Sequence, residues 1–69
     1  MEDWNRIVGD NVKRLRTMRG LTQEKLAVDA EIDLTYAGGI ERGRRNPSLE
    51  VLGRIANALG ADITELFER

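Results

Sequence analysis

Apolar residues recur at helical spacing along almost the whole of this 69-residue chain, and glycines or helix-capping residues repeatedly interrupt them. The first run has the intervals of three and four residues that place side chains on one face of an α-helix, at Trp4, Val8, Val12 and Leu15. The alternation of apolar and polar residues that a half-buried β-strand requires is almost absent. The pattern therefore predicts an all-α fold of short helices packed on one another.

The capping residues and glycines divide the chain into five expected helices. A side-chain oxygen just before a helix satisfies its free N–H groups, and a glycine just after it lets the chain turn away. The expected N-caps are Thr22, Asp33, Ser48 and Asp62, and the expected terminators are Gly20, Gly43 and Gly60. The helix after Asp33 is expected to cover about residues 34–42. Because no linker separates the helices, residues 1–69 are predicted to form a single compact domain.

The composition excludes several classes of function. The chain contains neither cysteine nor histidine, which removes disulfides, thiolate metal sites and the commonest general base. Its acidic residues are scattered over helical surfaces without a nucleophile or a metal-binding set, so we expect no enzyme, no cofactor and no metal site. No apolar run approaches the ~20 residues that span a bilayer, and the acidic N-terminus does not look like a secretory signal. We therefore expect a cytoplasmic protein without a membrane partner.

Positive charge is concentrated in two clusters, although the net charge of the chain is only -1. The first cluster comprises Lys13, Arg14, Arg16 and Arg19, and the second comprises Arg42, Arg44 and Arg45. Acidic residues lie between the two, so any basic face must be assembled by folding. Charge alone favours an ordinary solvated surface over a DNA-binding one.

Residues 22–43 have the form of a helix-turn-helix. Two short expected helices are joined by about three residues, and small side chains lie near the turn, at Ala27, Ala30 and Ala37. Two helices that cross steeply need such small residues where they touch. An α-helix fits the major groove of B-DNA, and the second helix of this motif is the one placed there.

Several further segments agree with one known pattern in their order and spacing. They are NVKRLR at residues 11–16, GLTQEKLA at 20–27, IERGRRNPSL at 40–49, LG at 59–60 and ELF at 65–67. Together they closely resemble the phage-repressor/Cro-like helix-turn-helix family of DNA-binding domains, over about residues 8–67. The pair Thr35-Tyr36 followed by GGIERG is most similar to the small controller proteins of restriction-modification systems.

The resemblance implies a sequence-specific transcriptional regulator and assigns its DNA-binding residues. Thr22 and Gln23, at the start of the second helix, are expected to contact phosphate. The residues expected to face the groove are Leu34, Thr35, Tyr36 and Gly39, and those expected to contact the DNA backbone from the following loop are Arg42, Arg44, Arg45 and Asn46. The alternatives are a plain exposed glutamine at Gln23, a core position for Tyr36 and a merely solvated arginine loop.

The same resemblance implies a partly buried ion pair between Arg16 and Glu41, which would hold the recognition helix in place. A homodimer on a palindromic operator is also expected, because one short helix reads too few base pairs to specify a site. The expected self-contact lies in the C-terminal helices, at Leu59, Ile63, Leu66 and Phe67, although some of these must also serve the core of the single protomer. The alternative function is a protein-interaction module, such as the antitoxin of a toxin-antitoxin pair.

Three features need a structural explanation. Glu31 stands at a turn position that is usually glycine in this family, and a positive φ there would strain it. Together with Asp29 and Asp33 it forms an acidic patch that weakens phosphate binding unless these side chains are paired or point away. Gly38 and Gly39, inside the recognition helix, permit either close approach to DNA or close packing, and we expect Gly39 to face DNA.

Overall fold

Four α-helices and one 3-10 helix make up the computed structural model, which describes residues 2–69. The α-helices are α1 (Trp4–Met18), α2 (Gln23–Ala30), α3 (Leu34–Glu41) and α4 (Leu49–Leu59), and the 3-10 helix is η1 (Ile63–Phe67). Residues 2–69 contain no strand, which confirms the all-α prediction. The prediction of five α-helices is wrong in its last element, because η1 is a single short stretch wound with the tighter hydrogen bonds of a 3-10 helix.

Capping side chains start the helices where the sequence predicted them. The side-chain oxygens of Thr22 and Ser48 accept the backbone N–H groups of Lys25 and Val51 at 3.0 and 3.1 Å. At the start of η1 the Asp62 carboxylate accepts both the backbone N–H and the hydroxyl of Thr64, which lowers the pKa of Asp62 below its ordinary value. The glycines expected to terminate α1, α3 and α4 all have positive φ, at Gly20, Gly43 and Gly60.

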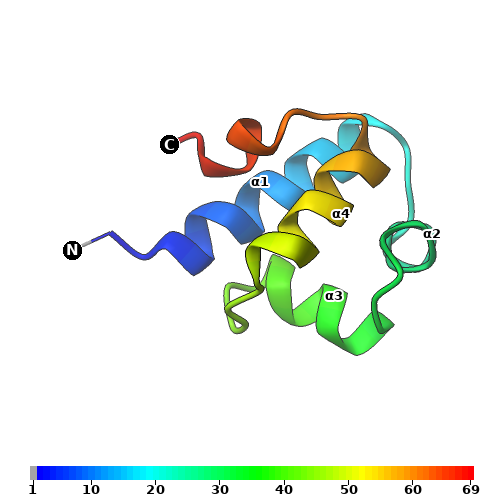
Figure 1. The fold of residues 1–69 in the computed structure, drawn as a ribbon, viewed down its shortest axis with the longest axis horizontal. Coiled ribbons are helices and arrows are strands. Elements are labelled where there is room, and N and C mark those ends of the chain that lie inside the picture. The colour runs from blue at the N-terminus through cyan, green and yellow to red at the C-terminus, as the bar shows by residue number, and fades with distance from the viewer. Residues whose placement is uncertain (1) are drawn as a thin grey trace.

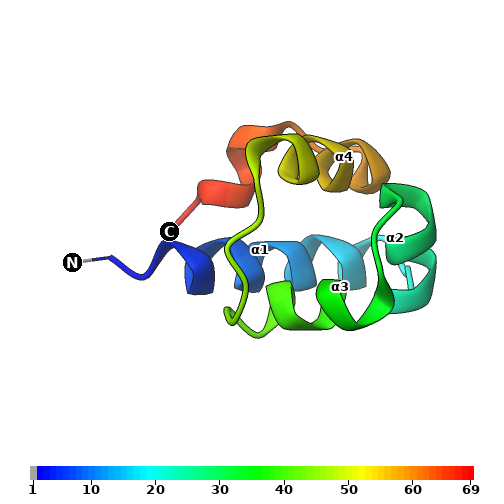
Figure 2. The ribbon, with the colours of Figure 1, turned by 60° about the horizontal axis from the view of Figure 1, so that its bottom comes forward.

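The helices surround one apolar core in which α1 is central. In Figure 2, α1 runs between α3 on one side and α4 with η1 on the other, and α2 closes the end of the molecule opposite the termini. The largest fully buried side chains come from all five elements or the turns beside them: Val12, Leu26, Ile40, Ile55, Leu59 and Leu66. Figure 1 shows the same arrangement with α3 on the lower edge of the molecule, away from η1 and the C-terminus. No helix of residues 2–69 combines the length and apolar character needed to cross a membrane.

Gly9 allows α1 and α3 to lie against each other backbone to backbone. A Cβ atom at this position would be 2.3 Å from the carbonyl oxygen of Ile40 and 2.9 Å from that of Glu41. Real Cβ atoms do not come so close to backbone oxygens, so only glycine fits here. The end of α3 therefore packs on α1 without an intervening side chain.

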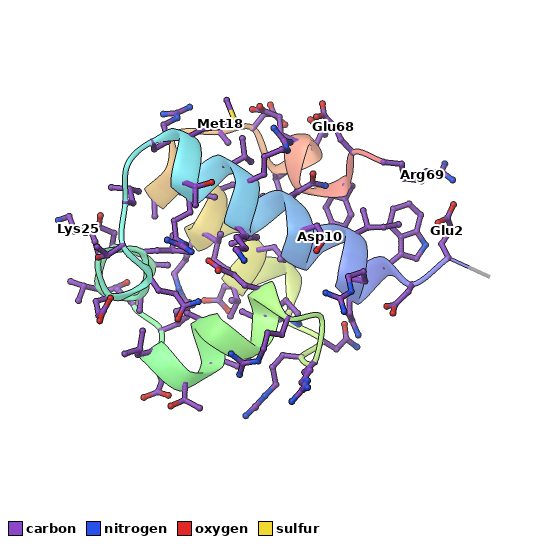
Figure 3. The ribbon with its side chains drawn as sticks, turned by 180° about the vertical axis from the view of Figure 1, so that it is seen from behind. Glu2, Asp10, Met18, Lys25, Glu68 and Arg69 are labelled. Atoms are coloured by element: carbon purple, nitrogen blue, oxygen red, sulfur yellow. The ribbon has the colours of Figure 1, made fainter. Side chains whose placement is uncertain are left out.

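The C-terminal segment is fastened to α1 by polar contacts. The buried side-chain amide of Asn11 donates to the carbonyl oxygens of Leu66 and Glu68 at 2.9 and 2.6 Å. Arg14 pairs with the Glu68 carboxylate, and the rings of Trp4 and Phe67 meet edge to face. Glu2 and Arg69 form a further ion pair, and Figure 3 shows these two side chains together at one end of the molecule.

Candidate nucleic-acid interface

The turn between α2 and α3 is formed by a non-glycine residue in a left-handed conformation. Glu31 has φ 58° and ψ 46°, and its backbone N–H donates to the carbonyl of Val28. Ile32 N–H then donates to the Ala27 carbonyl at 2.9 Å, which closes the end of α2. The small residues expected at the helix crossing are all buried, at Ala27, Ala30 and Ala37. The sequence therefore anticipated both the strained turn and the close helix contact.

A buried ion pair attaches the end of α3 to α1, as predicted. Arg16 Nε lies 2.6 Å from Glu41 Oε2, and Arg16 Nη2 lies 3.1 Å from Glu41 Oε1. The Glu41 side chain is only 3% exposed and that of Arg16 14%, so water hardly screens the pair. Arg16 Nη1 also donates to the carbonyl of Leu21, and Gln23 Nε2 donates to Glu41 Oε1 at 3.0 Å. The amide of Gln23, expected to contact phosphate, thus also belongs to this internal network.

The first turn of α3 projects into solvent. Leu34 is 42% exposed and Thr35 is exposed, while Tyr36 is half-buried and packs against the core. Asp33 accepts the backbone N–H groups of Thr35 and Tyr36, so its charge stabilises the start of the helix. The ring of Tyr36 packs inward in part, as the core interpretation expects, and carries the Arg45 guanidinium on its face, 5.5 Å from the ring centre. The expected contact of Tyr36 with the groove stays a prediction.

The two basic clusters have different roles in the structure. In the first, Arg16 binds Glu41, Arg14 binds Glu68, and Arg19 donates to the Gly60 carbonyl at 3.2 Å. None of the ion pairs formed within residues 2–69 involves the second cluster, and its side chains are exposed, at Arg42, Arg44 and Arg45. Three exposed arginines directly after the end of α3 repel one another unless an anion lies nearby. This is the chemistry of a phosphate-binding surface.

The comparisons with known proteins agree with this geometry. A family model described as helix-turn-helix matches residues 12–66. The chain belongs to the helix-turn-helix family. It is 42% identical over 64 residues to an HTH-type transcriptional regulator of Sinorhizobium fredii, y4dJ, a match covering 93% of this chain and 83% of y4dJ.

Two further relatives of this helix-turn-helix protein have more specific names. The immunity repressor protein of Bacillus phage phi105 is 42% identical over 59 residues, which are 86% of this chain but only 41% of the phage protein. The crystal structure of the restriction-modification controller protein C.AhdI from Aeromonas hydrophila is 43% identical and matches with a TM-score of 0.89, covering 91% of this chain and 96% of C.AhdI. The resemblance to phage repressors is thereby confirmed, and the protein is a DNA-binding transcriptional regulator.

In this helix-turn-helix protein the acidic patch is largely engaged with the protein itself. Asp29 lies 3.2 Å from the Lys25 ammonium, and Asp33 caps α3. Glu31 is exposed in the turn. Two of the three carboxylates therefore have internal partners, which reduces their repulsion of a phosphate group.

Most of the expected DNA-binding residues lie close together. Gln23 and Arg42 meet beside Gly38, and Arg45 lies beside Gly39 and Tyr36. Thr22 is exposed, and its oxygen caps α2. Asn46 is exposed but also lines a shallow apolar pocket with Trp4, Asn5, Val8, Pro47, Leu52 and Phe67, so it is directed in part toward the termini.

Two residues that shape this surface were missed or differently explained. Gly9, which lets α3 pack closely on α1, was not identified from the sequence. A glycine in the middle of a long helix destabilises that helix, so its presence could have indicated a close packing contact. The space outside Gly39 is filled by the Arg45 side chain. The expected contact of Gly39 with DNA stays a prediction, and it requires Arg45 to move.

Proposed function

We propose that this regulator binds a two-fold symmetric operator as a homodimer, with α3 of each protomer in the major groove. The observation that carries the proposal is a helix whose first turn is exposed and whose end is fixed on α1 by the buried Arg16–Glu41 pair. Three exposed arginines follow that end, and none of them has a carboxylate partner within residues 2–69. A rigid helix supplies base contacts at a defined angle, and unpaired arginines supply the salt-sensitive attraction to phosphate. The proposal divides the surface into two parts.

Phosphate contacts are assigned to the residues at the edges of this surface. They are Thr22 and Gln23 at the start of α2 and the loop residues Arg42, Arg44 and Asn46. Base contacts are assigned to the exposed first turn of α3. Leu34 offers only apolar contact, as with a thymine methyl group, while the hydroxyl groups of Thr35 and Tyr36 offer hydrogen bonds.

The expected dimer surface has to be redrawn. Leu59 and Leu66 are 1% and 0% exposed within a single protomer, so they belong to its own core and are unable to form a self-contact. Of the four residues that the sequence offered for the interface, some were expected to serve the protomer's own core, and these two do; they are therefore removed from the expected interface. Ile63 is half-buried, and Phe67 remains 37% exposed. We place the self-contact on the side of Phe67, where the apolar pocket and the exposed Trp4 that lines it add apolar surface.

Two measurements test the proposal together. Selection from a random-sequence DNA pool is expected to enrich an inverted repeat whose half-site centres lie about one helical turn, ~34 Å, apart. Sedimentation with the selected DNA is expected to show two protomers per duplex. Phe67→Ser is expected to weaken dimer formation. The matched control is Met18→Ser, at a residue that is 70% exposed at the end of α1 away from Phe67, and it should leave dimer formation unchanged. Absence of any enriched sequence, or a bound monomer, would contradict the proposal.

We also place the protein with controller-type regulators, because C.AhdI, a restriction-modification controller protein, matches over 96% of its own length. The test is whether genes for a methyltransferase and an endonuclease adjoin the gene, and whether the protein binds the intervening promoter. The antitoxin alternative relied on the acidic patch, and the internal partners of Asp29 and Asp33 leave it without a favouring observation.

A further inference from the structure

One side of α3 carries Leu34 and Thr35 in its first turn. In the second turn the same side has only glycines and therefore no side chains. Residues four apart on a helix lie one above the other, so Gly38 follows Leu34 and Gly39 follows Thr35 on the same side. Both glycines are buried, although the first turn above them is exposed. A helix that reads DNA with this side would meet the bases with bare backbone in its second turn.

Two arginines from beyond the helix fill this space. A Cβ atom on Gly39 would lie 2.8 Å from Arg45 Cγ and 3.3 Å from Arg45 Nε, so the arginine stem runs directly over this glycine. A Cβ atom on Gly38 would lie 3.1 Å from Arg42 Nη1. The guanidinium of Arg45 then reaches the Tyr36 ring, 5.5 Å from its centre. Arg45 is therefore folded back along α3 and does not extend from the loop as a free side chain.

We propose that Arg45 is a specificity-determining residue that reads guanine in the major groove together with α3. The proposal rests on the proposed function, and it moves Arg45 from the phosphate contacts, where the sequence placed it, to the base contacts. Arginine is suited to this role because two of its parallel N–H groups match the O6 and N7 atoms of guanine. Gly39 makes room for the stem, and the Tyr36 ring orients the guanidinium plane.

Arg44 is the matched control within the same loop. It carries the same charge and is exposed, but its side chain is not among those nearest to a Cβ atom at Gly38 or Gly39. Its contact with Gly39 is through the backbone, where the Arg44 N–H donates to the Gly39 carbonyl at 2.9 Å. An arginine that contacts only phosphate attracts every DNA sequence alike. Replacing Arg44 and replacing Arg45 should therefore have different consequences if the folded-back position of Arg45 matters.

The experiment is selection from a random-sequence DNA pool with the wild-type protein, Arg45→Ala, Arg45→Lys and Arg44→Ala, followed by affinity measurements at several salt concentrations. The wild type is expected to select guanine at one fixed position of each half-site. Arg45→Ala and Arg45→Lys are expected to lower discrimination at that position alone by about tenfold or more, because lysine keeps the charge but loses the paired donors. Arg44→Ala is expected to keep the guanine and to reduce the salt slope by about one.

Gly39→Ala tests the positioning independently. The added methyl group displaces Arg45, so the same guanine preference should fall while the positive charge is unchanged. Thermal unfolding of each variant separates this from loss of the fold, and Arg45→Lys decides the question if Gly39→Ala does not fold. Equal losses for all sequences with Arg45→Ala, as with Arg44→Ala, would overturn the inference and leave the proposed function intact. No sequence preference in the wild type would overturn both.

Discussion

The two sides of α3 are held in different ways. On the inner side, backbone carbonyls of Ile40 and Glu41 lie against Gly9 of α1, and the Glu41 carboxylate is buried on Arg16. On the outer side, the helix is covered by side chains from other segments, such as the exposed Arg45 over Gly39 and Arg42 with Gln23 beside Gly38. Backbone contacts and a buried ion pair leave no room to adjust, whereas an exposed arginine moves easily.

Under the proposed function, stability and DNA recognition are assigned to opposite sides of one helix only eight residues long. Changes on the inner side should lower the free energy of unfolding, and they should weaken DNA binding only because less of the protein is folded. Changes on the outer side should alter DNA binding and leave unfolding nearly unchanged. The following predictions test this separation.

The largest effect on stability is expected from Glu41→Ala. This change leaves the Arg16 guanidinium buried without its carboxylate and removes the acceptor of Gln23, and it should lower the free energy of unfolding by about 3–5 kcal/mol. Urea unfolding gives the value, and a double-mutant cycle with Arg16→Met isolates the pair. A coupling energy near zero would show that the two charges act independently.

Gly9→Ala is expected to be nearly as harmful. The new methyl group would meet backbone oxygens of α3, which have no freedom to move aside, so a loss of about 1–3 kcal/mol is expected. Gly53→Ala is the matched control in α4, because nothing lies within 4 Å of a Cβ atom there. Thermal unfolding should show the control to be neutral or stabilised by up to ~1 kcal/mol. Similar losses for both would remove the role assigned to Gly9.

Glu31→Gly should change stability in the opposite direction. Glu31 holds a left-handed backbone conformation, with φ 58°, at the turn that sets α3 against α2. A non-glycine residue is strained there, so glycine should raise the stability by about 1 kcal/mol. The measurement is the unfolding midpoint in urea at constant slope. A lower midpoint would mean that the Glu31 side chain stabilises the turn by more than the backbone strain.

Thr35→Ala should have the smallest effect on unfolding, within about 0.5 kcal/mol, because the side chain is exposed on the outer side. Its effect on DNA should be a changed base preference, at about 1–3 kcal/mol for a lost contact, with little change in salt dependence. Binding selection at two salt concentrations checks this. A loss of stability comparable to that of Gly9→Ala would contradict the assignment of stability to the inner side and DNA recognition to the outer side of α3.

Besides the family, the sequence alone predicted where the four α-helices begin and end. These features depend on local chemistry: a Thr, Ser or Asp side chain binds the N–H groups of the next turn, as Thr22 and Ser48 do, and a glycine adopts the positive φ after a helix, as Gly43 does. The Arg16–Glu41 pair was anticipated only through the family resemblance, since the two residues are far apart in the chain. The five residues of η1 were predicted to form an α-helix, because a capping residue and apolar spacing do not distinguish a short α-helix from a short 3-10 helix.

Tertiary structure decided which apolar residues are available and where the arginines go. Leu59 and Leu66 are buried in the core of a single protomer, while Phe67, next to Leu66 in the sequence, stays partly exposed. Arg45 covers Gly39, six residues earlier in the chain, because the loop folds back along α3. Spacing along a sequence records the period of a helix but not which neighbours will cover each of its sides. Those contacts exist only once α1, α3 and α4 have packed together.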